Sequence, residues 1–427
     1  MTDQKVMNRW LVVVGALLIQ LCLGAIYAWS VFTPYLKGAT PDPVTQFNFT
    51  STQTQAIFSV GLASFAVIMI LAGRWQAKSG PRLVSFVGGV VLGLGYIIGS
   101  FVGKYFIGQL IAIGLIGGAG IGLAYVCPIA VGMRWFPDKK GLITGLAVAG
   151  FGFGAMIWVK LAGSWGHLIE SHGVLRVFLI YGIVFAAAVI IGSFFMKYPP
   201  ETWKPKGYSP PEATGAGPAA GTVEFESGEM LRTPQFYGLW TTFIFSAWAG
   251  LMTIGIIKLF GIDALQKSGY SLAEASAIAG TAMAVYLSIA NGLGRIIWGT
   301  ISEKIGRKRA IFAMTLFQGI MMLLFYYMGG SKGLLFLGAA IIGFNFGGNF
   351  SLFPTATADF FGTRSVGPNY GWMFTAYGVG GIIGPILAGY VRDTWKNFQV
   401  AFIIAGAVCI LAAVITMALK PPKKASA

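Results

Sequence analysis

The sequence predicts an all-α membrane protein whose twelve transmembrane helices form two pseudo-symmetric halves of six helices each. Three observations predict this class. Apolar residues make up 56% of the 427 residues and charged residues only 10%, whereas a soluble domain carries about 25% charged residues. The mean hydropathy is +0.73, and the apolar residues form successive segments of about 20 residues, the length that crosses a bilayer core. The third observation is a loop motif that recurs at an offset of 226 residues.

Each predicted span is a segment of mostly apolar residues with few charges. The first span is longer than the apolar core of a secretory signal peptide and lacks a small-residue cleavage pattern, so we expect it to remain as a membrane-spanning helix. The spans lie near residues 10–35, 55–75, 83–102, 106–131, 142–165, 174–196, 236–260, 272–301, 310–328, 333–357, 370–391 and 398–419.

One long polar stretch, residues 197–235, separates the sixth predicted span from the seventh. It is rich in Pro, Gly and Thr, a composition that is typical of a linker. We therefore expect an N-terminal six-helix half at residues 1–196, a cytoplasmic linker at 197–235 and a C-terminal six-helix half at 236–427.

The net charge of +16 follows the expected membrane topology. If both termini are cytoplasmic, the cytoplasmic segments hold 20 of the 30 Lys and Arg residues, as the positive-inside rule requires. This asymmetry predicts an integral protein of a bacterial-type plasma (inner) membrane that contacts anionic lipid. It argues against a nucleic-acid partner.

The sequence gives little basis for enzyme chemistry. Cys22, Cys127 and Cys409 all fall inside predicted spans, where small core residues are expected, and His167 and His172 fall in a predicted outer loop. No cluster has metal-ligand spacing, and no nucleophile–base set or phosphate-binding loop is present. We therefore expect a protein that is not an enzyme and that uses no cofactor or metal.

Arg295 is the charge that the apolar pattern does not explain. Glu303 marks the cytoplasmic end of the eighth span, and Arg295 lies eight residues before it. Eight residues correspond to about 12 Å along a helix. Helical side chains lean toward the helix N-terminus, so the guanidinium reaches toward the bilayer midplane. Exposure to lipid there would cost roughly 3 kcal/mol. Lys160 and Lys258 lie further out, and we expect both to reach the outer rim.

Two interpretations of Arg295 are open: snorkelling or pairing with another helix, and binding of an anion in a central cavity. No Asp or Glu lies centrally in any predicted span, so we favour the cavity. A planar guanidinium suits a carboxylate because it donates two parallel hydrogen bonds. Asn291 lies one turn earlier on the same helix face and adds a donor.

The loop segment GRWQAKSGPR, which begins at Gly73, recurs as GTISEKIGRKR from Gly299. Glycines of the fifth and eleventh spans follow the same offset, so we expect two parallel repeats with a site between them. The segment Gly299–Arg309 resembles the loop signature of the major facilitator superfamily, with Glu303 in the acidic position that Ala77 occupies in the first copy. The resemblance implies the major facilitator fold. It also implies conformational gating by the motif residues Gly73, Gly80, Arg82, Gly299, Glu303, Lys304 and Gly306.

Three segments resemble the oxalate–formate antiporter family and its monocarboxylate-transporting relatives: RWFPDKKGLITG from Arg134, SGEMLRTPQF from Ser227 and NGLGRIIWGTISEKIGR from Asn291. Oxalate-exchanging members carry a lysine where this sequence has Tyr377, and one cation implies a monoanionic substrate. Many proton-coupled relatives carry an Asp at the position of Asn291, so proton coupling through a side chain there is not expected. The resemblance further implies a pocket whose aromatic walls are Tyr27, Tyr125, Phe346, Phe350 and Phe374.

The sequence therefore predicts a proton-coupled secondary transporter of a small monocarboxylate such as lactate, pyruvate, formate or acetate. The main alternative is oxalate:formate exchange, and a membrane receptor or non-transporting scaffold is a further one. The expected partners are the carboxylate anion, the proton and membrane lipid, and the expected oligomeric state is a monomer.

Overall fold

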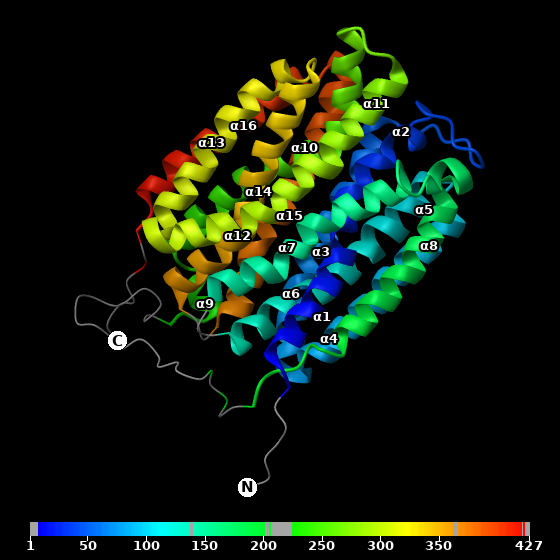
Figure 1. The fold of residues 1–427 in the computed structure, drawn as a ribbon. Helices are drawn as coiled ribbons and strands as arrows, with labels where there is room; N and C mark the ends of the chain where they lie inside the picture. Colours follow the sequence, from blue (N-terminus) through cyan, green and yellow to red (C-terminus); the bar gives the residue numbers. More distant parts are fainter. Residues whose placement is uncertain are drawn as a thin grey trace.

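The computed structural model describes residues 7–136, 140–200, 203, 205, 224–362, 365–420 and 422, with the side chains of residues 140–142 and 144 left aside. Twelve helices in these ranges are long and apolar enough to cross a membrane, which confirms the predicted number. No β-strand occurs in the described part of the chain. The helices run side by side as one elongated bundle, so the predicted all-α membrane fold is confirmed (Figure 1).

The first six spans are built from eight α-helices and two segments of other helix types. They are α1 (Arg9–Leu23), which continues as the 3₁₀ helix η1 (Gly24–Val31) and α2 (Thr33–Leu36); α3 (Ser51–Ser79); α4 (Pro81–Val102); α5 (Phe106–Gln109), which continues as the π-helix η2 (Leu110–Gly117) and α6 (Gly118–Trp135); α7 (Lys140–Ala162); and α8 (Leu168–Ser193).

The short α9 (Ser227–Met230) precedes the last six spans. Their elements are α10 (Pro234–Lys267); α11 (Leu272–Thr281), which continues as the π-helix η3 (Ala282–Leu287) and α12 (Ser288–Ile305); α13 (Arg307–Met328); α14 (Lys332–Phe361); α15 (Val366–Trp395); and α16 (Gln399–Ala418).

The two largest interfaces between the first six spans and the last six are formed by four helices. α3 packs along α15, and α7 packs along α12. The 226-residue offset relates α3 to α12 and α7 to α15, so each interface is the counterpart of the other under the internal repeat. The division of the chain at residues 197–235 stays a prediction, because much of that stretch lies outside the described residues.

α1 begins and α16 ends at the same face of the bundle, which we call the terminal face (Figure 1). The other end is the opposite face. Near the terminal face, Trp135 Nε1 donates to the Lys197 carbonyl at 2.7 Å. Asn369 Nδ2 of α15 donates to the Phe225 carbonyl at 2.9 Å. The described ends of the predicted linker are therefore each attached to a different group of six spans.

The structure departs from uniform α-helices in three spans, which the sequence analysis did not predict. The first span tightens into η1 at Gly24, and a β-carbon at Gly24 would overlap the carbonyl oxygen of Phe151 on α7. Backbone contact of this closeness needs a glycine. The wider π-helices η2 and η3 lie in the fourth and eighth spans, and such segments occur often at functional sites.

Candidate functional site

Arg295 lies on α12 and faces the interface with α7, where protein encloses its side chain completely (0% exposed). The close approach of α12 to its neighbours positions it. A β-carbon at Gly347 of α14 would overlap the Asn291 carbonyl oxygen, and one at Gly152 of α7 would lie 2.6 Å from Asn291 Oδ1. Glycines at these positions therefore let three helices meet around the arginine.

The Arg295 guanidinium is partly satisfied by protein acceptors. Its Nε donates to Asn291 Oδ1 at 3.1 Å, and its Nη1 donates to the Val148 carbonyl of α7 at 3.0 Å. Its Nη2 is buried without a hydrogen-bond partner. No carboxylate among the described residues lies within ion-pair distance of it. The free edge of a buried cation is thus available to an anion.

Aromatic rings surround this arginine. The Arg295 Cζ lies 3.9 Å from the ring centroid of Phe350 and 5.3 Å from that of Phe151. Cation–π contact stabilises the guanidinium in place of water. The structure brings all eight predicted substrate-site residues into one buried cluster: Arg295, Asn291, Tyr27, Tyr125, Phe346, Phe350, Phe374 and Tyr377.

The cluster is rich in donors that have no acceptor. Besides Arg295 Nη2, the Asn291 Nδ2 and the hydroxyls of Tyr125 and Tyr370 are buried without a partner. The hydroxyls of Tyr27 and Tyr377 hydrogen-bond each other at 3.0 Å, so one of the two accepts and keeps its own proton without an acceptor among the described residues. Buried donors without acceptors destabilise a protein, and a carboxylate supplies the acceptors and the negative charge that would satisfy them.

Sequence reasoning missed three residues of the cluster. Tyr370 packs against Phe374 with ring centroids 5.6 Å apart, Phe65 packs against Tyr125 at 4.9 Å, and Phe151 faces Arg295. Tyr370 lies one helical turn before Phe374, so the helical period alone identifies it. Phe65 and Phe151 carry no such signal, because a phenylalanine in a membrane span is common.

The two groups of six spans touch at both ends of the cluster. Near the opposite face, Thr52 Oγ1 donates to Asp393 Oδ2 at 2.6 Å, and Gln55 Nε2 donates to the Gly255 carbonyl at 3.1 Å. Near the terminal face, a β-carbon at Gly73 would lie 3.7 Å from a backbone oxygen of α15. The site is therefore closed toward both faces. Lys37 lies beside the Thr52–Asp393 contact. Burial of its ammonium group, together with the positive charge of Arg392, lowers the pKa of Lys37.

The predicted gating residues occupy two tight corners at the terminal face. Gly80 and Gly306 adopt positive φ of 84° and 87° between consecutive spans, a conformation that favours glycine. Arg82 stacks on the Phe194 ring at 4.6 Å. Glu303 and Lys304 are exposed.

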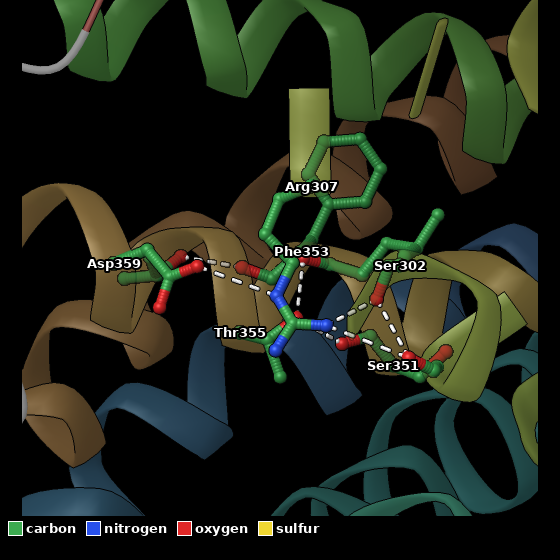
Figure 2. Close-up of polar contacts among 9 residues, drawn as sticks. Ser302, Arg307, Ser351, Phe353, Thr355 and Asp359 are labelled. Carbon is green, nitrogen blue, oxygen red and sulfur yellow. Dashed lines mark hydrogen bonds and ion pairs between the residues drawn. The ribbon is translucent and has the colours of Figure 1, made fainter. Parts of the chain in front are cut away.

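The second corner is held by an ion pair that sequence analysis did not predict. Arg307 Nε donates to Asp359 Oδ2 of α14 at 3.3 Å, and Arg307 Nη1 donates to the Gly299 carbonyl at 3.4 Å and to the Ser302 hydroxyl. Figure 2 shows the guanidinium between Asp359 and Ser302. Glu303 makes no ion pair with any described residue, so its gating role stays a prediction.

Twelve membrane spans that enclose a charged site between two groups of six helices define a secondary transport protein. The chain belongs to the Major Facilitator Superfamily, whose family model matches residues 17–288 and 269–427. The protein is therefore an integral membrane transporter of this superfamily.

Three relatives are similar over most of their length. The oxalate:formate antiporter of Oxalobacter formigenes is 26% identical over 407 residues, which cover 95% of this chain and 90% of the antiporter. Apicoplast pyruvate carrier 1 of Toxoplasma gondii is 26% identical over 452 aligned positions, which cover 86% of this chain and 81% of the carrier. Monocarboxylate transporter 13 of Rattus norvegicus is 24% identical over 401 residues, which cover 93% of this chain and 86% of the transporter. The resemblances drawn from the sequence motifs are thus confirmed.

Proposed function

We propose that this protein is a secondary transporter of a small monocarboxylate of the lactate, pyruvate, formate or acetate type, which works by alternating access. The observation that carries the proposal is the buried Arg295, whose Nη2 faces a cluster of tyrosine and asparagine donors without acceptors. The similarity to a pyruvate carrier and to a monocarboxylate transporter supports the substrate class.

In the proposed complex, one carboxylate oxygen accepts from Arg295 Nη2, and Asn291 Nδ2 and the hydroxyls of Tyr125 and Tyr370 donate to the remaining lone pairs. Rings such as Phe350 contact the apolar part of the substrate. These rings also lower the local dielectric constant, which strengthens the attraction between arginine and carboxylate.

Alternating access requires the contacts on one face to break while those on the other hold. We propose that residues 1–196 and 236–427 rock about the Arg295 cluster, and that the terminal face is cytoplasmic in a bacterial-type inner membrane. The excess of Lys and Arg in the segments at the terminal face supports this orientation. Opening toward the other side then breaks the Thr52–Asp393 and Gln55–Gly255 hydrogen bonds. We further propose that the protein acts as a monomer.

We propose that a proton accompanies the substrate, carried on its carboxyl group or released after the anion leaves Arg295. Asn291, which does not titrate, stands at the position where many proton-coupled relatives carry an aspartate. A proton that moves with the monoanion makes the cycle electroneutral, so a pH gradient alone drives accumulation.

The second candidate function is oxalate:formate exchange, which the similarity to the antiporter favours. Two features argue against it. The cluster contains one cation, and Tyr377 stands where oxalate exchangers carry a lysine. A dianion would leave one negative charge unpaired in an apolar site.

Uptake of radiolabelled pyruvate, lactate, formate, acetate and oxalate into proteoliposomes tests the proposal. An inward proton gradient should drive uphill accumulation of a monocarboxylate without any internal anion. Accumulation that requires an internal anion and ignores the pH gradient would instead establish exchange. Failure of every carboxylate to enter would refute carboxylate transport.

A further inference from the structure

The hydroxyls of Tyr27 and Tyr377 form a polar pair that the carboxylate contacts proposed above leave unused. Tyr27 lies in η1 and Tyr377 on α15, so the pair joins the first six spans to the last six. The two side chains are 1% and 0% exposed, and their oxygen atoms are 3.0 Å apart. Either hydroxyl can be the donor, and the one that accepts keeps a proton that no described residue receives.

Ring contacts place this pair beside the Arg295 guanidinium. The Tyr27 ring packs edge-on against Phe151 with centroids 4.9 Å apart, and the Tyr377 ring packs edge-on against Phe350 at 5.6 Å. These are the same rings that Arg295 Cζ contacts, at 5.3 Å for Phe151 and 3.9 Å for Phe350. The charge of Arg295 therefore acts on both hydroxyls.

The pair and the Tyr370 hydroxyl border the site at different depths. Tyr377 follows Tyr370 by seven residues on α15, which runs from the terminal face to the opposite face; seven residues correspond to about 10 Å along a helix. Tyr27 contacts Phe346 with ring centroids 5.7 Å apart, one turn nearer the opposite face than Phe350. The pair therefore covers the side of the cluster that faces the opposite face.

The donors of the cluster outnumber the acceptor positions of a carboxylate. The unpartnered donor atoms are Arg295 Nη2, Asn291 Nδ2 and the hydroxyls of Tyr125 and Tyr370. A carboxylate offers about four lone-pair positions, so these atoms use all of them and none is left for the proton of the pair. Because a buried donor without an acceptor is destabilising, that proton calls for a further acceptor on the substrate.

We propose that the Tyr27–Tyr377 pair selects a substrate with an oxo group on carbon 2, the atom next to the carboxyl group. The 2-oxo oxygen accepts the free proton of the pair while the carboxylate binds Arg295. Acetate and formate have no oxygen outside the carboxylate, and the hydroxyl of lactate brings a further proton into a cluster that lacks acceptors. This inference rests on the proposed function and narrows its substrate class to 2-oxo monocarboxylates such as pyruvate.

Pyruvate and propionate test the pair, because the two anions differ only at carbon 2, where pyruvate carries an oxo oxygen and propionate carries two hydrogens. One hydrogen bond to a buried donor distinguishes them, so we expect pyruvate to bind the parent about tenfold more tightly. Ligand-dependent thermal stabilisation of the purified protein in detergent measures both dissociation constants without any transport step. This comparison needs no variant.

The double variant Tyr27→Phe/Tyr377→Phe removes both hydroxyls and keeps both rings. Both are replaced because a single remaining hydroxyl could still donate. The dissociation constant of pyruvate should rise about tenfold, whereas that of propionate should stay within about twofold of the parent value. A purely structural role of the hydroxyls would weaken the binding of both anions alike, so equal losses would refute the inference.

Tyr286→Phe/Tyr390→Phe is the matched control, because it removes two exposed tyrosine hydroxyls; it should leave both dissociation constants unchanged. If the parent binds pyruvate and propionate equally, the pair does not select the substrate, although carboxylate binding stands. If neither anion stabilises the parent, the proposed function fails and this inference fails with it. If pyruvate binds with the expected preference but does not enter proteoliposomes, the role of the pair stands and transport fails.

Discussion

Replacement of Arg295 by lysine is the sharpest test of the central site, because it keeps the charge and removes the planar fork. The arginine uses Nε and Nη1 on Asn291 and Val148 and keeps Nη2 free. A lysine at this position has one donor atom, so it must give up either these protein acceptors or the substrate. One charge-assisted hydrogen bond contributes about 1.5–3 kcal/mol. We therefore expect the substrate dissociation constant to rise between about tenfold and about a hundredfold.

Arg295→Gln loses the charge as well as the fork. Two unit charges 4 Å apart attract by about 4 kcal/mol at an effective dielectric constant of about 20, so we expect an affinity about a thousandfold lower. The same substitution removes a completely buried cation that has no carboxylate partner among the described residues. Without ligand, the variant should therefore unfold at the same or a higher temperature than the parent.

Pyruvate uptake in proteoliposomes and pyruvate-dependent thermal stabilisation in detergent measure the two effects. At 100 times its dissociation constant, a ligand stabilises the parent by about 2.7 kcal/mol. In Arg295→Gln, the same thermal stabilisation should require a pyruvate concentration at least about a hundredfold higher than in the parent. Arg176→Lys, at an exposed arginine of α8, is the control and should match the parent. Uptake by Arg295→Lys within twofold of the parent would refute the assignment of the carboxylate site.

Three further predictions follow from the contacts around the site. Tyr377→Lys adds a second cation, so the preference for oxalate over pyruvate should rise about tenfold; an unchanged preference would show that the number of cations does not select the substrate. Gly152→Ala places a β-carbon 2.6 Å from Asn291 Oδ1. The protein should therefore insert into the membrane, but the two groups of six spans should fail to close over the site. Cysteines near the site, which the parent protects, should be labelled rapidly in this variant. Asp393→Asn weakens the 2.6 Å contact with Thr52, so labelling from the opposite face should rise about tenfold; equal labelling would exclude this contact as a gate.

Membrane hydropathy predicted the twelve spans, because each span must bury its backbone polar groups in a helix of fixed length. It did not predict η1, η2 and η3, because these segments depend on how neighbouring backbones meet. At Gly24, for example, the first span touches the Phe151 carbonyl. The apolar composition of the span is the same in either helix type, so composition carries no information about the change.

The central cluster was predictable where charge or helical period singles out a residue, as for Arg295 and Asn291. Phe65 and Phe151 were missed because a phenylalanine is common in a membrane span and carries no charge that singles it out. The Arg307–Asp359 ion pair was missed for a different reason. Its partners belong to different spans, 52 residues apart, and the sequence does not show which helix ends meet at the terminal face.

The distribution of charge between the two repeats bears on coupling. The 226-residue offset places Met69 opposite Arg295, so only one repeat supplies a cation. The other repeat contributes a carbonyl, at Val148, and hydroxyls, one of which bonds Tyr377. The contacts that close the two groups of spans over Arg295 are thus made by protein groups, and closure itself uses no anion. A carrier that closes in this way can return across the membrane without a second substrate, as symport requires and obligatory exchange forbids. Pyruvate efflux into anion-free medium should then run at a rate within about twofold of exchange against external pyruvate. Efflux that stops without external anion would remove this argument for symport.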